Sequence, residues 1–128
     1  MDRQMMKNSN PKALENHFPS GELESRGTQI DGRGVGAFRR WHESCSLFAE
    51  SEYVDGQLNG MIREWAEDDR PLLLASVKNG EFDGSYKSWW SSGLPKEAGT
   101  YKAGKRIGRY IRYDTDGSIW NCLDIPAK

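Results

Sequence analysis

Glycine recurs along this chain with a period of 24 residues, and this repeat constrains the fold more than any other feature. Two glycine series lie four residues apart: Gly32, Gly56, Gly80 and Gly104, and Gly36, Gly60, Gly84 and Gly108. Bulky residues follow the second series at two and at five positions: Phe38, Ile62, Tyr86 and Tyr110, and Trp41, Trp65, Trp89 and Tyr113. A fixed period of this length is the signature of a repeat architecture, in which each unit packs on its neighbours.

The residues around the glycines predict two tight turns in each unit. Three pairs are typical of hairpin turns because glycine supplies a positive φ: Asp31-Gly32, Asp55-Gly56 and Asn79-Gly80; Ala103-Gly104 is a weaker signal. The second turn contains Gly21, Gly93 or Gly117, but Cys45 and Asp69 replace this glycine in two copies, which leaves the turn geometry there open. The segments between turns have the usual length of strands.

These turns and segments predict an all-β fold, an elongated antiparallel β-meander with two strands per 24-residue repeat. We expect a polar N-terminal tail at residues 1–15 and a repeat domain at residues 16–125, of about four and a half units. The composition agrees, since only 36% of the 128 residues are hydrophobic while the chain has 14 Gly and 5 Trp. That mix suits short strands in a thin sheet better than a helical bundle.

The two faces of the predicted sheet both carry aromatic residues. Strand alternation places Met61, Arg63 and Trp65 on one face, and Ile62 and Glu64 on the other, with the same split in the other copies. A bulge could swing the tryptophan to the opposite face. The tryptophan column is either repeat packing or an exposed stripe of interface residues, and the sequence leaves both open.

The repeat resembles the MORN repeat in its bacterial variant. The residues that carry the resemblance are "VDGQLNGMIREW" (54–65), "KNGEFDGSYKSWW" (78–90) and "KAGKRIGRYIRY" (102–113), with "DGRGVGAFRRW" (31–41) as a fourth copy. The resemblance covers roughly residues 16–124. Small bacterial proteins of this kind are often antitoxins or immunity proteins of polymorphic toxin systems, and other MORN-repeat proteins are membrane-associated or scaffolding modules. The resemblance therefore implies one of these two functions.

The sequence predicts no catalytic, cofactor-binding or metal-ligating residue, and we expect the protein not to be an enzyme. It has no nucleophile elbow, no H-E-x-x-H, no C-x-x-C and no Walker loop. His17 and His42 are expected to have structural or surface roles, and "DTDGS" (114–118) is interpreted as a turn. Cys45 and Cys122 are predicted to be free thiols.

Location and net charge give only broad expectations. The N-terminus has no apolar run typical of a signal peptide, and no segment approaches the ~18 apolar residues of a membrane span. We expect a cytoplasmic protein. The balance of 18 Lys+Arg against 19 Asp+Glu favours no direct binding to nucleic acid. The oligomeric state is left open.

Charge is unevenly distributed along the chain, and this pattern supplies the candidate binding residues. Residues 43–69 contain eight acids and one base, Arg63, whereas residues 26–40 and 102–112 are basic. An ordinary solvated surface explains this pattern as well as function does. The functional hypothesis is that an acidic surface occludes the basic cleft of a cognate toxin. Its predicted partner-binding residues are Glu50, Glu52, Glu64, Glu67, Asp68 and Asp69, with Arg63 and Trp65.

Overall fold

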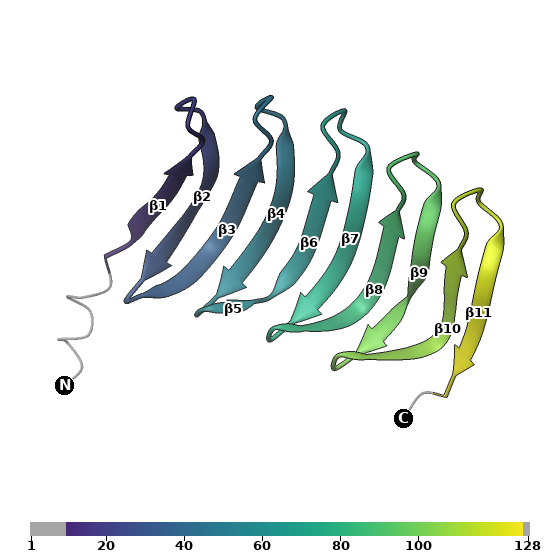
Figure 1. Cartoon of the computed structure of the whole chain (residues 1–128). Helices are drawn as coiled ribbons and strands as arrows, with labels where there is room; N and C mark the ends of the chain where they lie inside the picture. Colours follow the sequence, from purple (N-terminus) through teal and green to yellow (C-terminus); the bar gives the residue numbers. More distant parts are fainter. Residues whose placement is uncertain (1–9, 127–128) are drawn as a thin grey trace, which may run out of the picture.

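The computed structural model describes residues 10–126, which form one antiparallel sheet (Figure 1). Its eleven strands are β1 (Lys12–His17), β2 (Leu23–Ile30), β3 (Arg33–Trp41), β4 (Leu47–Val54), β5 (Gln57–Leu58), β6 (Gly60–Trp65), β7 (Pro71–Lys78), β8 (Glu81–Trp89), β9 (Pro95–Lys102), β10 (Lys105–Tyr113) and β11 (Ile119–Ile125). Ten strands pair in chain order, and β5 pairs with β4. The predicted all-β meander is confirmed, and residues 10–126 contain no helix.

The sheet begins earlier than the sequence predicts. Residues 12–15, which we expected to belong to the polar tail, form most of β1 and pair with β2 from Lys12↔Gln29 onward. All six side chains of β1 are exposed, so no hydrophobic pattern marks this strand in the sequence. The rest of the predicted tail, residues 1–9, lies outside the described residues.

The first turn of each unit, which we call the tip turn, has two residues in the left-handed region. Asp31, Asp55, Asn79 and Ala103 have φ angles of 49–53°, and the glycine that follows each has a φ of 78–86°. Two successive positive φ angles between paired strands define a type I′ hairpin turn, whose twist matches that of the strands. Ala103 adopts the same conformation although its sequence signal is weaker.

The second strand of the unit bends at the second glycine. In β8, three residues (83–85) lie opposite the single residue Ser76 of β7, between the pairs Ala75↔Tyr86 and Val77↔Phe82. The same irregularity lies between Arg26 and Thr28 in the β2–β3 pair, and between Ile107 and Ile111 in the β9–β10 pair. Such bulges bend a strand and increase its local twist, so the hairpins in Figure 1 are curved.

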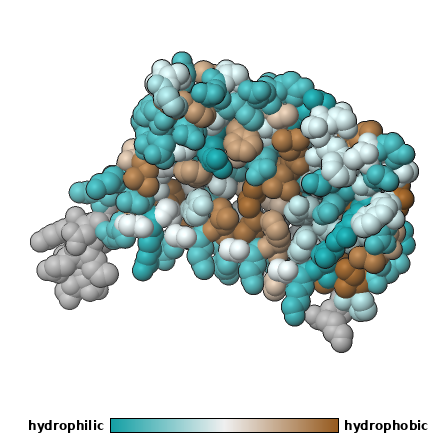
Figure 2. Space-filling model, in the orientation of Figure 1, coloured by the Kyte–Doolittle hydropathy of each residue, from teal (hydrophilic) through white to brown (hydrophobic). Residues whose placement is uncertain are grey.

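The side chains at this bend form the small hydrophobic core of the sheet. Tyr110 is only 1% exposed, and Ala75 and Val77 are also buried. Aromatic rings gather on this side of the sheet, which we call the aromatic face: Phe38, Tyr53, Phe82, Tyr86, Tyr101 and Tyr110. In Figure 2 brown, hydrophobic surface runs through the middle of the visible side of the molecule.

Small residues alternate with these bulky ones across the strands. They also recur every 24 residues: Gly27, Ser51, Ala75 and Gly99. A Cβ on Gly27 would lie 2.6 Å from Cδ1 of Phe38, and a Cβ on Gly99 would collide with the ring of Tyr110. Each aromatic ring therefore rests on a backbone that has little or no side chain, which allows a thin sheet to close-pack.

The second turn of each unit keeps one geometry in all five copies. In the β3–β4 turn the His42 N–H donates to Ser46 O and the Cys45 N–H donates to His42 O, each at 2.9 Å. Equivalent pairs of bonds close the turns that begin at Phe18, Ala66, Trp90 and Asp114. Cys45 and Asp69 adopt φ angles of 77° and 69°, so both occupy the glycine conformation. The "DTDGS" segment is such a turn, as predicted.

Candidate functional site

The predicted binding residues divide among two faces and one turn. The register places Glu50 opposite both Arg39 and Arg63, which puts these three side chains on one face. Glu52 lies two residues from Glu50. Both side chains border a surface hollow that Met61 and Arg63 also line. Glu64 pairs with Leu73 and lies on the aromatic face, next to Tyr86 and Glu97. The eight residues therefore do not form one patch.

The face opposite the aromatic one carries an ion-pair row, which we call the charged row: Glu15, Arg26, Arg39, Glu50 and Arg63. Glu50 lies between two arginines, with Arg39 Nε 2.8 Å from Oε2 and Arg63 Nη1 3.6 Å from Oε1. Arg26 Nε lies 3.4 Å from Glu15 Oε2 at the end of the row. Glu50 is thus neutralised within the sheet, and these half-exposed pairs contribute only about 0–1 kcal/mol each to stability.

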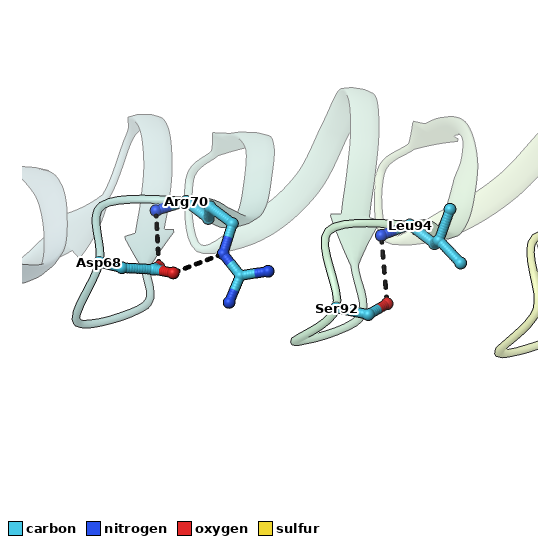
Figure 3. A network of polar contacts seen from close by, with 4 residues as sticks. All are labelled: Asp68, Arg70, Ser92 and Leu94. Carbon is cyan, nitrogen blue, oxygen red and sulfur yellow. Dashed lines mark hydrogen bonds and ion pairs between the residues drawn. The ribbon is translucent and has the colours of Figure 1, made fainter.

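The β6–β7 turn contains three acids with different surroundings. Asp68 accepts hydrogen bonds from the backbone N–H of Arg70 at 3.3 Å and from Arg70 Nε at 2.7 Å (Figure 3). Desolvation raises the pKa of Asp68, but the bonds and charge of Arg70 outweigh it and leave this pKa below its ordinary value. Glu67 and Asp69 are exposed and have no ion pair within residues 10–126.

Asp68 belongs to a column of turn residues that recurs every 24 residues: Ser20, Ser44, Asp68, Ser92 and Asp116. In the neighbouring turn, Ser92 Oγ accepts a bond of 3.4 Å from the Leu94 N–H, and Figure 3 shows both turns side by side. Asp116 accepts bonds from the N–H and hydroxyl of Ser118, which lower its pKa. These short side chains fix the turn locally, which is a structural role for Asp68.

Trp65 and its equivalents occupy an intermediate environment. Trp41, Trp65 and Trp89 are half-buried, so the column is neither a dry core nor a fully exposed stripe. A register irregularity immediately precedes each of them, as the sequence allowed. The Trp65 carbonyl also accepts a hydrogen bond from Nε2 of His42 at 3.0 Å, which gives that histidine a structural contact.

The hydroxyl of the buried Tyr110 lies in the aromatic face and makes polar contacts that the sequence analysis missed. The Tyr110 hydroxyl donates to Glu97 Oε1 at 2.7 Å and lies 3.4 Å from the Tyr101 hydroxyl. Burial, followed by these hydrogen bonds, raises the pKa of Tyr110 far above its ordinary value. Arg106 lies over the Tyr110 ring, 4.9 Å from its centre. The 24-residue column of small residues was the signal that could have located this buried ring.

Residues 10–126 contain no group of three or more His, Cys, Asp or Glu side chains placed to hold a metal ion. No helix in this part of the chain is long and apolar enough to cross a membrane. Cys45 and Cys122 are free thiols, as predicted, and both are exposed. No protein-family model matches the sequence, and no curated protein matches it.

Proposed function

We propose that this protein is an immunity protein or antitoxin, which neutralises a cognate bacterial toxin by covering its active site. We also infer that its 24-residue unit is a variant of the MORN repeat. The regular tip turn, bend and second turn support this inference, because they recur at equivalent positions along the chain. The resemblance of these units to MORN repeats is what suggests the toxin-neutralising function.

One observation supports the acidic binding surface more than any other. Glu67 and Asp69 are exposed at a turn and lack ion pairs within the described residues, whereas Glu50 and Asp68 are each held by an arginine. An acid that already has an arginine partner gains little when it binds a second cation, so Glu67 and Asp69 are the two acids of the β6–β7 turn that are available to a basic toxin cleft. The β6–β7 turn lies in the middle of a row of five such turns (Figure 1).

The test uses charge reversal of the two available acids. A chain with Glu67→Lys and Asp69→Lys is co-expressed in a bacterial host with the product of the open reading frame next to its own gene. We expect the variant to lose protection against growth arrest and to bind the purified toxin at least tenfold more weakly. Asp68 is left unchanged because it fixes the turn.

The matched control reverses two acids elsewhere. Glu43 is the equivalent of Glu67 in the β3–β4 turn, and Glu81 lies next to a tip turn at the other end of the hairpins; both are exposed. The Glu43→Lys, Glu81→Lys chain has the same net charge as the test variant and should protect like wild type. Equal protection by both variants would reject the acidic turn as the toxin-binding surface. If the wild-type chain does not neutralise the neighbouring gene product, the antitoxin proposal itself is rejected.

A membrane- or scaffold-associated module is the second candidate. The observation that favours it is a hollow beside the last tip turn, lined by Lys102, Lys105 and Arg106 together with Ile107 and Ile125. Basic side chains around apolar ones suit an anionic lipid surface. Co-sedimentation with vesicles that contain phosphatidylserine, but not with phosphatidylcholine vesicles, would favour this candidate over the first.

A further inference from the structure

Within residues 10–126 the first and the last strand of the sheet belong to different halves of the repeat unit. Each unit consists of a first strand, a tip turn and a second strand. The first strands are β2, β4, β7, β9 and β11, and the second strands are β1, β3, β6, β8 and β10. Among the strands of residues 10–126, β1 is therefore a second strand to which no first strand is paired, and β11 is a first strand to which no second strand is paired. Within residues 10–126 each of them has only one neighbour.

The two incomplete ends complement each other. We propose that the protein assembles head to tail, with β1 of one copy completing the unit that β11 of another copy begins. The ends lie at opposite sides of the row of hairpins in Figure 1, so the added copy would continue the same sheet. An edge strand presents unpaired N–H and C=O groups that can bind such a strand. A contact between two different surfaces does not close on itself, so assembly would proceed beyond a dimer.

The register inside the chain gives the register between copies. First and second strands of one unit pair as Leu73↔Ser88 and Leu74↔Lys87 in β7–β8, and as Glu97↔Arg112 and Ala98↔Ile111 in β9–β10. The β9–β10 pairs are thus the β7–β8 pairs with 24 added to both residue numbers. Extending the same shift places Asn121, Cys122 and Leu123 of one copy opposite Asn16, Glu15 and Leu14 of the next.

Apolar side chains at the two edges support this register. Leu14 on β1 is 44% exposed. The extended register places it beside Leu123 of the other copy, where the two side chains would extend the apolar surface of the aromatic face. Trp120 on β11 is 64% exposed. Its equivalent Leu72 borders a hollow with Trp89, and the equivalent of Trp89 in β1 is His17. Trp120 would therefore gain the contact with His17 that its own copy does not provide.

The charged row also places no unpaired charge at the contact between copies. Strand pairs connect this row across the whole sheet from Glu15 to Cys122. Glu15 is already paired with Arg26 at 3.4 Å, and the residue opposite it in the next copy is the small, uncharged Cys122. Closing the contact therefore does not bury a lone carboxylate.

Cysteine cross-linking tests the register directly, with the native Cys122 thiol as one partner. Directly opposed residues of an antiparallel pair have Cα atoms within the range that a disulfide spans. We expect the Glu15→Cys, Cys45→Ser chain to form dimers, trimers and higher multimers on mild oxidation. The matched control, Asn16→Cys with Cys45→Ser, places its thiol on the opposite face and should cross-link at least tenfold more slowly. Equal rates would overturn the register, and dimers that persist after Cys122→Ser would indicate β1–β1 pairing.

Complementation tests the head-to-tail arrangement independently of disulfides. Leu14→Lys changes only the β1 edge and Trp120→Lys only the β11 edge; both side chains are exposed, so both variants should fold. In sedimentation velocity runs the mean mass of wild type should rise with concentration, and each variant alone should stay at the 14.5 kDa of one chain. In an equimolar mixture the unchanged β11 edge of the Leu14→Lys chain can pair with the unchanged β1 edge of the Trp120→Lys chain. The mixture should therefore give a species of two chains. A monomeric wild type, or a single variant that still dimerises, would overturn the proposal.

Discussion

At the scale of single residues, Gly99 is the glycine of the described chain at which an added Cβ would come closest to another side chain, the ring of Tyr110. A Cβ at position 99 would collide with the Tyr110 ring, whereas Ala75 accommodates Tyr86 at the equivalent point. We therefore expect Gly99→Ala to lower the free energy of unfolding by about 1–3 kcal/mol, as overpacking does elsewhere. Urea denaturation measures this change. Thr100→Ala, at the next and exposed position, is the control and should change stability little; a neutral Gly99→Ala would show that the ring moves aside.

The Tyr110 hydroxyl should make stability depend on alkaline pH. Its pKa is raised by burial and by the bonds to Tyr101 and Glu97, whereas tyrosine in the unfolded chain titrates near its ordinary value of about 10. The favourable contribution of the protonated hydroxyl is complete below that pH and is lost as the pH rises above it, because only the unfolded state releases its proton.

This dependence can be measured by removing the hydroxyl. Tyr110→Phe loses the 2.7 Å bond to Glu97, so at neutral pH we expect it to be less stable than wild type by about 1 kcal/mol. The difference should shrink when urea denaturation is repeated at a pH between 10 and 11. Tyr113→Phe, at the end of the same strand, is the control. A difference that stayed constant with pH would exclude the linkage.

At the scale of elements, the second turns contain a removable strain. Cys45 and Asp69 have positive φ angles at positions where the other three copies have glycine. A left-handed conformation costs a residue with a side chain roughly 1 kcal/mol relative to glycine. We expect Cys45→Gly and Asp69→Gly each to raise the midpoint of thermal unfolding, and Gly93→Ala to lower it. A fall in the midpoint for Cys45→Gly would mean that the contact of its thiol with Glu22, at 3.4 Å, outweighs the strain.

The sequence predicted the turns and strands better than it predicted the contacts between side chains. Asp-Gly and Asn-Gly pairs act through local backbone geometry, so the tip turns and the strands between them were predictable. The alternation of side chains also correctly separated Glu64 from Arg63. Ion-pair partners carry no such signal: Arg39 reaches Glu50 across a strand pair, and Arg70 pairs with Asp68 within the turn, from just beyond the acidic stretch. Counting charges along the chain therefore does not show which acids already have an arginine partner.

At the scale of the whole molecule, stability should decrease from the centre of the sheet towards its ends. The buried residues of the described chain belong to β2, β7, β8 and β10, each of which has two paired neighbours, and none belongs to β1 or β11. β1 has one neighbour and six exposed side chains, and β11 also has one neighbour. In a repeat array each unit is held mainly by those beside it, so terminal strands open with a smaller free energy than central ones.

Hydrogen exchange resolved along the chain tests this gradient. In dilute solution the amides of β1 and β11 should exchange at least tenfold faster than those of β7 and β8, since edge strands open without unfolding the centre. Uniform protection would mean that the sheet unfolds as one cooperative unit. Head-to-tail assembly adds a second expectation, because each contact gives both edge strands another neighbour. Protection should then rise with protein concentration in β1 and β11 together and stay constant in β7, and the Leu14→Lys chain should lose this concentration dependence in both strands.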